Sequence, residues 1–148
     1  MTIMEYKCTE CGFEFRDDSL IFYIENDKLV ETSLTLESSK KMNESELMGY
    51  LYIGYCNSCD NYIKTYVPEL KGEFNEKEVV NKINNLIDTS NNDTKILIFD
   101  FDETSFQSRR NVLCDNICPK CENTMCLLID EFHPCPKCGK DNIIDINE

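Results

Sequence analysis

The chain has 148 residues, enough for one domain or two small ones and too few for a large multi-lobed enzyme. Its 28 acidic side chains outnumber 15 basic ones, and a formal net charge of −13 disfavours the basic face of a nucleic-acid-binding protein. No apolar run is long enough to span a bilayer, and the first residues lack the pattern of a secretory signal. We therefore expect a cytoplasmic, non-membrane protein whose ten cysteines serve metal binding rather than disulfides.

The first half of the chain is predicted to be β-rich. Its β-prone segments lie at residues 20–25, 28–34, 50–55 and 61–67. Asn26 and Asp27 are typical of the tight turn of a hairpin between the first two segments. The polar residues 38–46 predict a loop or a short helix. Pro68 is expected to end the fourth strand, because proline cannot donate a hydrogen bond to a neighbouring strand.

The middle of the chain carries the clearest helix signal. Asn75 followed by Glu78 has the form of an N-cap with a reciprocal carboxylate. Apolar residues then recur at helical spacing: Val79, Val80, Ile83, Leu86 and Ile87. Residues 95–101 follow as an apolar run without alternation, which predicts a strand covered on both faces.

Eight of the ten cysteines form four pairs with the same Cys-x-x-Cys spacing. The pairs are Cys8/Cys11, Cys56/Cys59, Cys118/Cys121 and Cys135/Cys138. Two such turns supply the four thiolates of a tetrahedral Zn²⁺ site, so four turns predict two zinc ions. Gly12 and Gly139 each follow a pair directly, where a turn often needs a positive φ.

The four pairs can be combined into two sites in three ways. Sequential pairing is expected, because it closes the shortest loops. Cys121 and Cys135 are separated by 13 residues, close to the usual ribbon spacing, whereas 44 residues separate Cys11 from Cys56. An arrangement in which Cys8/Cys11 joins the last pair stays open.

The segments KCTECG, YCNSCD, CPKCE and CPKCG resemble the knuckles of zinc-ribbon proteins, and the last also resembles a rubredoxin knuckle. The zinc-ribbon resemblance implies structural ions between β-hairpins. The rubredoxin resemblance implies iron and one-electron transfer. Glu122 stands where a rubredoxin knuckle has glycine, so zinc is favoured over iron. A redox dithiol is a further reading, but that motif belongs in a βαβ unit, and these pairs lie among short β segments and turns.

Three other residues are candidate metal ligands or structural thiols. Cys126 lies in a predicted strand over residues 124–130 and is expected to be a buried apolar thiol. Cys114 precedes Cys118 by four residues and is a spare-ligand alternative, and His133 could replace a cysteine ligand or lie in a loop.

The segment ILIFDFDET resembles the first motif of haloacid-dehalogenase-type phosphatases. That resemblance implies Asp100 as the nucleophile and Asp102 as the acid. The family's chemistry requires several βαβ units, for which the 44 residues after Thr104 leave too little chain. The ends of a solvated strand explain the motif better, and we expect no enzyme.

Nucleic-acid binding has two sequence features in its favour. The first is a group of tyrosines around the second knuckle: Tyr50, Tyr52, Tyr55, Tyr62 and Tyr66. The second is the least acidic part of the chain, with Arg109, Arg110, Lys120, Lys137 and Lys140. Acidic neighbours favour a structural role for the tyrosines, and overall acidity disfavours phosphate contacts.

These observations predict a mostly β fold with one helix (small α+β). Two four-cysteine zinc-ribbon lobes would be joined by an amphipathic helix and a buried strand. The expected divisions are residues 1–71 for the N-terminal lobe, 72–107 for the connection and 108–148 for the C-terminal ribbon. We expect a non-enzymatic zinc protein that is an adaptor or regulatory subunit for a protein partner. A transcription-type nucleic-acid regulator and a rubredoxin-like iron carrier are the alternatives.

Overall fold

The computed structural model describes residues 4–17, 20–69, 75–87, 90, 93–98, 116–128 and 135–146. Within these residues the chain forms ten strands and two helices, arranged as one small and one large sheet. The fold is therefore mostly β, as predicted, and belongs to the small α+β class. Among the described residues, neither helix has the length and apolar character needed to cross a membrane.

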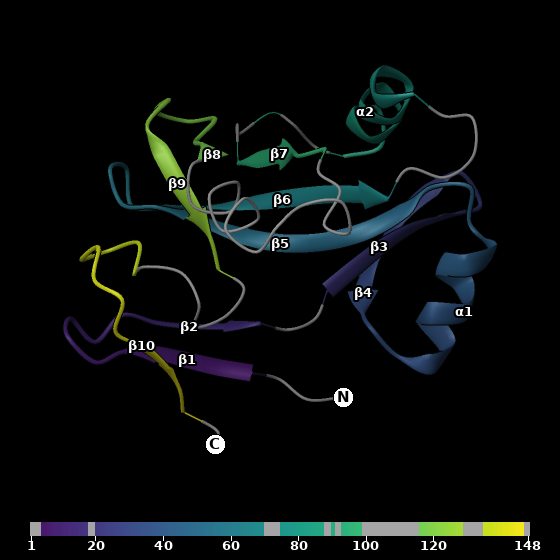
Figure 1. Ribbon diagram of the computed structural model, residues 1–148. Helices are drawn as coiled ribbons and strands as arrows, with labels where there is room; N and C mark the ends of the chain where they lie inside the picture. Colours follow the sequence, from purple (N-terminus) through teal and green to yellow (C-terminus); the bar gives the residue numbers. More distant parts are fainter. Residues whose placement is uncertain are drawn as a thin grey trace.

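The small sheet brings together the first and last strands of the described chain. It has the order β10-β1-β2, with β1 at Met4–Cys8, β2 at Glu14–Asp17 and β10 at Ile143–Asp145. Both pairings are antiparallel, and Figure 1 shows β1 and β10 side by side. A strand of the predicted C-terminal ribbon thus pairs with one of the predicted N-terminal lobe. The proposed boundaries after residues 71 and 107 stay a prediction.

The large sheet has the order β4-β3-β5-β6-β7, and β9 joins it through β5. Its strands are β3 Leu20–Glu25, β4 Lys28–Ser33, β5 Met48–Cys56, β6 Asn61–Glu69, β7 Thr94–Ile96, β8 Asn116–Ile117 and β9 Thr124–Leu127. Every pairing is antiparallel except that of β6 with β7. The predicted hairpin between β3 and β4 is confirmed: Asn26 and Asp27 have φ values of 54° and 61°, as a two-residue turn of this kind requires.

The hairpin of β5 and β6 is the centre of the large sheet, and it is longer than predicted. Pro68 does not end β6, which runs to Glu69. Pro68 faces Gly49 of β5, while the described pairing with β7 on the other side ends at Tyr66, so no β7 residue needs its missing N–H. Gly49 is required here: a Cβ would lie 2.3 Å from the Val67 carbonyl oxygen and 2.6 Å from Pro68 Cα.

The described residues contain two helices, whereas the sequence predicted one. The segment interpreted as a loop or short helix contains α1 at Leu36–Glu44, which begins at the N-cap Thr35. The Thr35 hydroxyl accepts a hydrogen bond from the Ser38 N–H, and the Ser38 hydroxyl accepts one from the Thr35 N–H. Met42 packs with Ile21 and other residues of the sheet, so tertiary contact stabilises a helix whose own pattern is weak.

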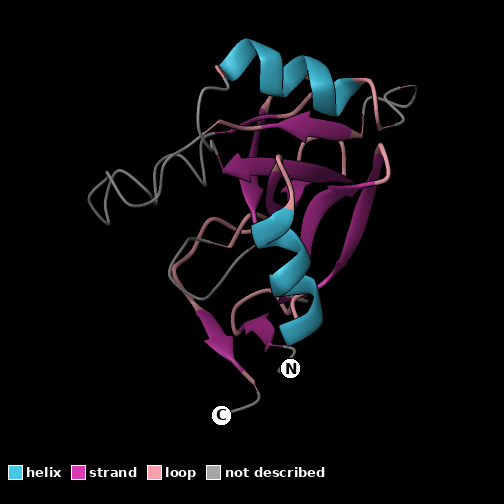
Figure 2. Cartoon of the chain, turned by 90° about the vertical axis from the view of Figure 1, so that its right-hand side faces the viewer, coloured by secondary structure: helices cyan, strands magenta, loops and turns pink. Residues whose placement is uncertain are grey.

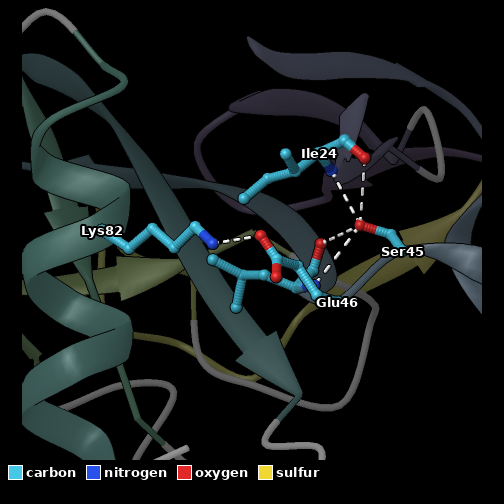
Figure 3. A network of polar contacts seen from close by, with 5 residues as sticks. Ile24, Ser45, Glu46 and Lys82 are labelled. Carbon is cyan, nitrogen blue, oxygen red and sulfur yellow. Dashed lines mark hydrogen bonds and ion pairs between the residues drawn. The ribbon is translucent and has the colours of Figure 1, made fainter. Parts of the chain in front are cut away.

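A small polar network fixes the path of the chain after α1 (Figure 3). The Ser45 hydroxyl oxygen accepts from the Ile24 N–H at 3.0 Å and lies 2.7 Å from the carbonyl oxygen of Leu47. Glu46 forms an ion pair with Lys82 of the second helix. The connection therefore joins α1, β3 and the second helix.

The second helix, α2, spans Glu76–Asn84 and confirms Asn75 as its N-cap, while the Glu78 carboxylate contacts the side-chain amide of Asn75. The Asn75 side chain accepts from the Glu78 N–H at 2.9 Å, and its amide donates to the Glu78 carboxylate at 3.0 Å. Val79 and Ile83 are buried against a cluster containing Phe22. Phe22 and Ile21 point to opposite faces of β3, so α1 and α2 cover opposite faces of the sheet (Figure 2).

The apolar run after α2 differs from its prediction. β7 covers Thr94–Ile96, and residues 94–98 are half-buried rather than fully covered. Ile96 packs on the cluster under α2, and Leu97 packs on a second cluster near the cysteines. Within the described chain β7 pairs with β6 alone, so it is an edge strand. Residues 99–101 of the predicted strand lie outside the described residues.

Candidate metal centres

The eight paired cysteines gather into two groups of four among the described residues. Cys8, Cys11, Cys135 and Cys138 form one group, here called the outer centre. Cys56, Cys59, Cys118 and Cys121 form the other, here called the inner centre. The grouping is nested: the first pair meets the last, and the two middle pairs meet each other. The expected sequential pairing is wrong, and the alternative that joined Cys8/Cys11 to the last pair is the observed one.

Strand pairing explains why the cysteine pairs that are neighbours in the sequence do not all share a centre. β1 leads into Cys8 and pairs with β10, which follows Cys138 after a short turn. Doubling a loop costs only about 0.6 kcal/mol in closure entropy. Burying one large apolar side chain contributes about 1.5–3 kcal/mol. Packing around Tyr6 and Ile143, both buried in the cluster with Cys8 and Cys135, therefore outweighs the loop-length term.

The four cysteine turns share one backbone geometry. In the outer centre, the Gly12 N–H donates to the Cys8 carbonyl at 2.9 Å, and the Gly139 N–H donates to the Cys135 carbonyl at 2.8 Å. The residue after each pair has a positive φ: Gly12 80°, Asp60 51°, Glu122 66° and Gly139 78°. The two glycines behave as predicted. The turn at Glu122 has the same positive φ as the turns with glycine. The residue at this position therefore does not discriminate between a zinc site and an iron site.

Sulfur–sulfur distances match a tetrahedral metal site. In the outer centre, Cys8 Sγ lies 3.6 Å from Cys138 Sγ, and Cys11 Sγ lies 3.6 Å from Cys135 Sγ. In the inner centre, the Cys56–Cys121 and Cys59–Cys118 distances are 3.4 and 3.8 Å. Four sulfurs at about 2.3 Å from one ion lie about 3.8 Å apart, whereas a disulfide needs about 2.05 Å. The cysteines therefore fit an ion with four thiolate ligands.

Backbone N–H groups and burial act in opposite directions on the thiols. Burial raises the pKa of Cys56 and of Cys135 to about 12. Burial also acts to raise the pKa of Cys8, but N–H donors of Cys11 and Glu10 outweigh it and lower this pKa to about 7. The Asn123 N–H is the main cause that lowers the pKa of Cys121 to about 7. The lowered pKa values of Cys8 and Cys121 favour the thiolate form, which is the form that binds a metal ion.

The surroundings of the two centres differ. Cys56 and Cys118 of the inner centre are fully buried in a cluster with Ile63, Met125 and Leu127. Cys59 and Cys121 are half-buried. In the outer centre Cys8 and Cys135 are buried, but Cys11 and Cys138 are exposed.

The sequence did not reveal the amide side chains near the sulfurs. The Asn123 side-chain amide donates to Cys121 Sγ at 3.6 Å, and the Asn61 amide donates to the Cys59 carbonyl at 2.8 Å. Asn57 connects the two centres, because its amide donates to the Lys137 carbonyl at 3.3 Å. Their only signal in the sequence is their position one or two residues from a ligand cysteine, and asparagine is too common in this chain for that to stand out.

The other candidate residues lie apart from the two centres or outside the described residues. Cys126 is buried in β9 and belongs to neither group, as expected of a structural thiol. The predicted roles of Cys114, His133, Asp100, Asp102, Arg109 and Arg110 lie outside the described residues. Lys120, Lys137 and Lys140 are exposed, and Lys140 lies 3.5 Å from a Glu10 oxygen in an ion pair.

The tyrosines predicted to crowd around the second knuckle do not form one continuous stacking face. Tyr50 and Tyr52 stack at 6.4 Å between ring centroids. Tyr55 and Tyr66 are buried, and Tyr62 is 55% exposed. Tyr55 packs on Phe13 at 5.0 Å, so part of the group is core.

No family model, curated protein or solved structure matches this chain. Its class is therefore set by the site alone: a mostly β protein with two cysteine tetrads that could hold metal ions.

Proposed function

We propose that this is a non-enzymatic zinc protein that acts as an adaptor or regulatory subunit for a protein partner. The observation that carries the proposal is the approach of eight sulfurs in two groups, with contacts of 3.6 Å in the outer centre and of 3.4 and 3.8 Å in the inner one. Four thiolates complete the coordination of Zn²⁺ and leave no position for water or substrate. The ions would hold the fold rather than perform a reaction.

Zinc is proposed because closed four-cysteine sites between β-turns are its usual structural setting. The same four thiolates could bind iron and carry one electron, as in rubredoxin. Metal identity is a direct measurement, so iron is an outcome of the test below.

The partner is proposed to be a protein because of charge. A zinc ion with four thiolates carries a net charge of −2, so two loaded centres would take the chain from −13 to about −17. A surface of this sign repels nucleic acid and attracts basic protein surfaces. Exposed apolar side chains such as Tyr62 and Ile117, at 55% and 51% exposure, offer contacts for such a partner.

Elemental analysis of the purified full-length protein tests the metal assignment. We expect two zinc ions per chain and a colourless solution. Iron with a red colour that bleaches on reduction would replace the proposal with an electron carrier, and a chain free of metal would overturn it.

Binding measurements test the adaptor role. We expect no binding to duplex DNA or single-stranded RNA at low ionic strength, and a protein partner that the zinc-loaded chain captures but the chelator-treated chain does not. Salt-sensitive nucleic-acid binding would favour the transcription-type regulator instead.

A further inference from the structure

We infer that the two centres have different roles: the inner centre is a permanent structural site, and the outer centre is an exchangeable zinc site that links the two ends of the chain. This inference rests on the proposed function, because it assumes that both centres bind zinc. It adds that zinc leaves the outer centre before it leaves the inner one.

Access to the ligands is the first argument. The exposed outer ligands, Cys11 and Cys138, come from different turns, so solvent and competing ligands reach the outer centre from both of its halves. The corresponding inner ligands, Cys59 and Cys121, are half-buried. Exchange of a four-thiolate ion needs an incoming ligand to reach a sulfur or the metal, and the outer centre allows this more readily.

Support from the surrounding fold is the second argument. The inner centre lies at the end of the β5–β6 hairpin, whose register runs without interruption from Met48↔Glu69 to Cys56↔Asn61. Fully buried Ile63 and Leu127 belong to the same apolar cluster as its ligands Cys56 and Cys118. The outer centre depends on β10, a three-residue strand, and its cluster is completed by Phe13 and Phe15, which are only partly buried.

The junction between the centres is loosely filled. A pocket of about 350 Å³ that is partly open to solvent lies between them, with Asn57, Ser58 and Thr124 on the side of the inner centre and Cys135 and Pro136 on the side of the outer one. The Asn57 amide crosses to Lys137, and the Phe13 ring packs on Tyr55. A junction that contains a solvent-accessible pocket loses less packing on separation than a close-packed core would, so the outer centre can open without disrupting the inner one.

Opening of the outer centre would separate the first strand of the described chain from the last one. Cys8 and Cys138 are 130 residues apart, and their shared ion would join β1 to the turn that precedes β10. Apart from the backbone hydrogen bonds between β1 and β10, the side-chain polar contacts described across this junction are exposed ones: the Thr9 hydroxyl with the Asn142 carbonyl at 3.2 Å and the Lys140–Glu10 ion pair at 3.5 Å. Loss of zinc from the outer centre would therefore release β10 from β1, while the large sheet stays folded.

The first test follows zinc release from the wild-type, full-length protein. Excess EDTA under reductant, with a zinc-sensitive dye and pulsed iodoacetamide labelling read by mass spectrometry, gives both the rate and the cysteines involved. We expect two phases of equal amplitude, with the faster phase labelling Cys11 and Cys138. Its rate should exceed the slower one by about tenfold or more, the scale on which surrounding groups alter metal binding. A single phase, or labelling of Cys59 and Cys121 first, overturns the inference.

The second test uses two matched double variants. Cys11→Ser with Cys138→Ser removes the more exposed ligands of the outer centre, and Cys59→Ser with Cys121→Ser is the corresponding change in the inner one. We expect the first variant to keep one zinc and normal hydrogen-exchange protection of β5 and β6, with protection lost in β1 and β10. The second variant should lose protection throughout. Loss of β5–β6 protection in the first variant overturns the inference, whereas a wild-type chain without metal overturns the proposed function itself.

Discussion

Cys8 and Cys138 lie 130 residues apart in the chain, yet their Sγ atoms are 3.6 Å apart. A second pair of this kind, Cys56 and Cys121, is 65 residues apart with sulfurs at 3.4 Å. The outer contact encloses the inner one in sequence. An ion in the inner centre would therefore connect residues that are 65 positions apart, and an ion in the outer centre would connect residues that are 130 positions apart.

Removal of metal is expected to unfold most of the protein. A structural zinc site contributes an apparent free energy of about 10–16 kcal/mol, comparable with the whole stability of an ordinary small domain, about 5–15 kcal/mol. Circular dichroism and thermal melting with chelator and reductant should show a large loss of β signal and a lower midpoint. Unchanged spectra and midpoint after verified zinc removal would contradict this.

Glu122→Gly is expected to stabilise the inner centre. Glu122 has a φ of 66°, a conformation that costs a side-chain-bearing residue about 1 kcal/mol and glycine almost nothing. Part of the gain is lost because glycine makes the unfolded chain more flexible. We expect a net gain of about 0.5 kcal/mol by urea unfolding of the zinc-loaded protein. Gly139→Ala, at a φ of 78°, is the converse variant and should destabilise. A lower stability of Glu122→Gly would refute the strain argument.

Gly49→Ala is expected to be among the most damaging small substitutions. The new Cβ would lie 2.3 Å from a backbone oxygen and 2.6 Å from Pro68 Cα, neither of which can move without shifting β6. We expect a loss of about 3 kcal/mol, at the upper end for overpacking. Gly54→Ala is the control, because its closest neighbour is the flexible Met125 side chain at 3.1 Å. Equal effects of the two changes in chemical denaturation would show that β5 and β6 separate more easily than the structure indicates.

Asn123→Ala is expected to weaken metal binding at the inner centre. Its side-chain amide donates to Cys121 Sγ, and groups that support ligands commonly alter metal affinity by about 10–100-fold. The Asn123 amide donates a single weak hydrogen bond at 3.6 Å, so we expect the affinity to fall by about tenfold, the lower end of that range. Competition with a zinc chelator measures the change, and Asn57→Ala serves as a control because the described hydrogen bond of the Asn57 side chain goes to the Lys137 carbonyl and not to a sulfur. A zinc affinity equal to that of the wild type would show that the Asn123 side chain does not support the metal ligand Cys121.

Stability at alkaline pH is expected to depend on Tyr66. Burial and the hydrogen bond to Glu31 raise the pKa of Tyr66, and the Asp93 charge adds to this, while Lys64 pairs with Glu31 at 2.7 Å. A raised pKa favours the neutral phenol in the folded state. The stabilisation is therefore complete below the ordinary tyrosine pKa of about 10 and is lost as the pH rises beyond it.

Tyr66→Phe separates this effect from the ionisation of other groups. The variant should be less stable at pH 7, by about 1.5 kcal/mol for a hydrogen bond to a charged group. The difference from wild type should shrink as the pH rises above about 10. Urea unfolding at a series of pH values measures it, and a constant difference would contradict the assignment.

Short sequence patterns were sufficient to predict the turns and the helix cap that they form. The turn at Asn26 and Asp27, the Asn75 cap and the four cysteine turns all depend on residues within four positions of one another. Their conformations follow from turn chemistry and capping, which neighbouring residues determine. The eight cysteines brought together in the two centres were identified for the same reason: each pair carries its own spacing.

Tertiary structure decided which pairs meet, and it did so through contacts that no local pattern records. β1 pairs with β10 across the length of the chain, and this pairing places Cys8 with Cys135 and Cys138 rather than with Cys56. Likewise α1 forms because Met42 packs on the sheet, and β6 continues through Pro68 because β7 does not reach that position. Loop-closure entropy changes too slowly with length to select among these pairings, so packing and strand register make the choice.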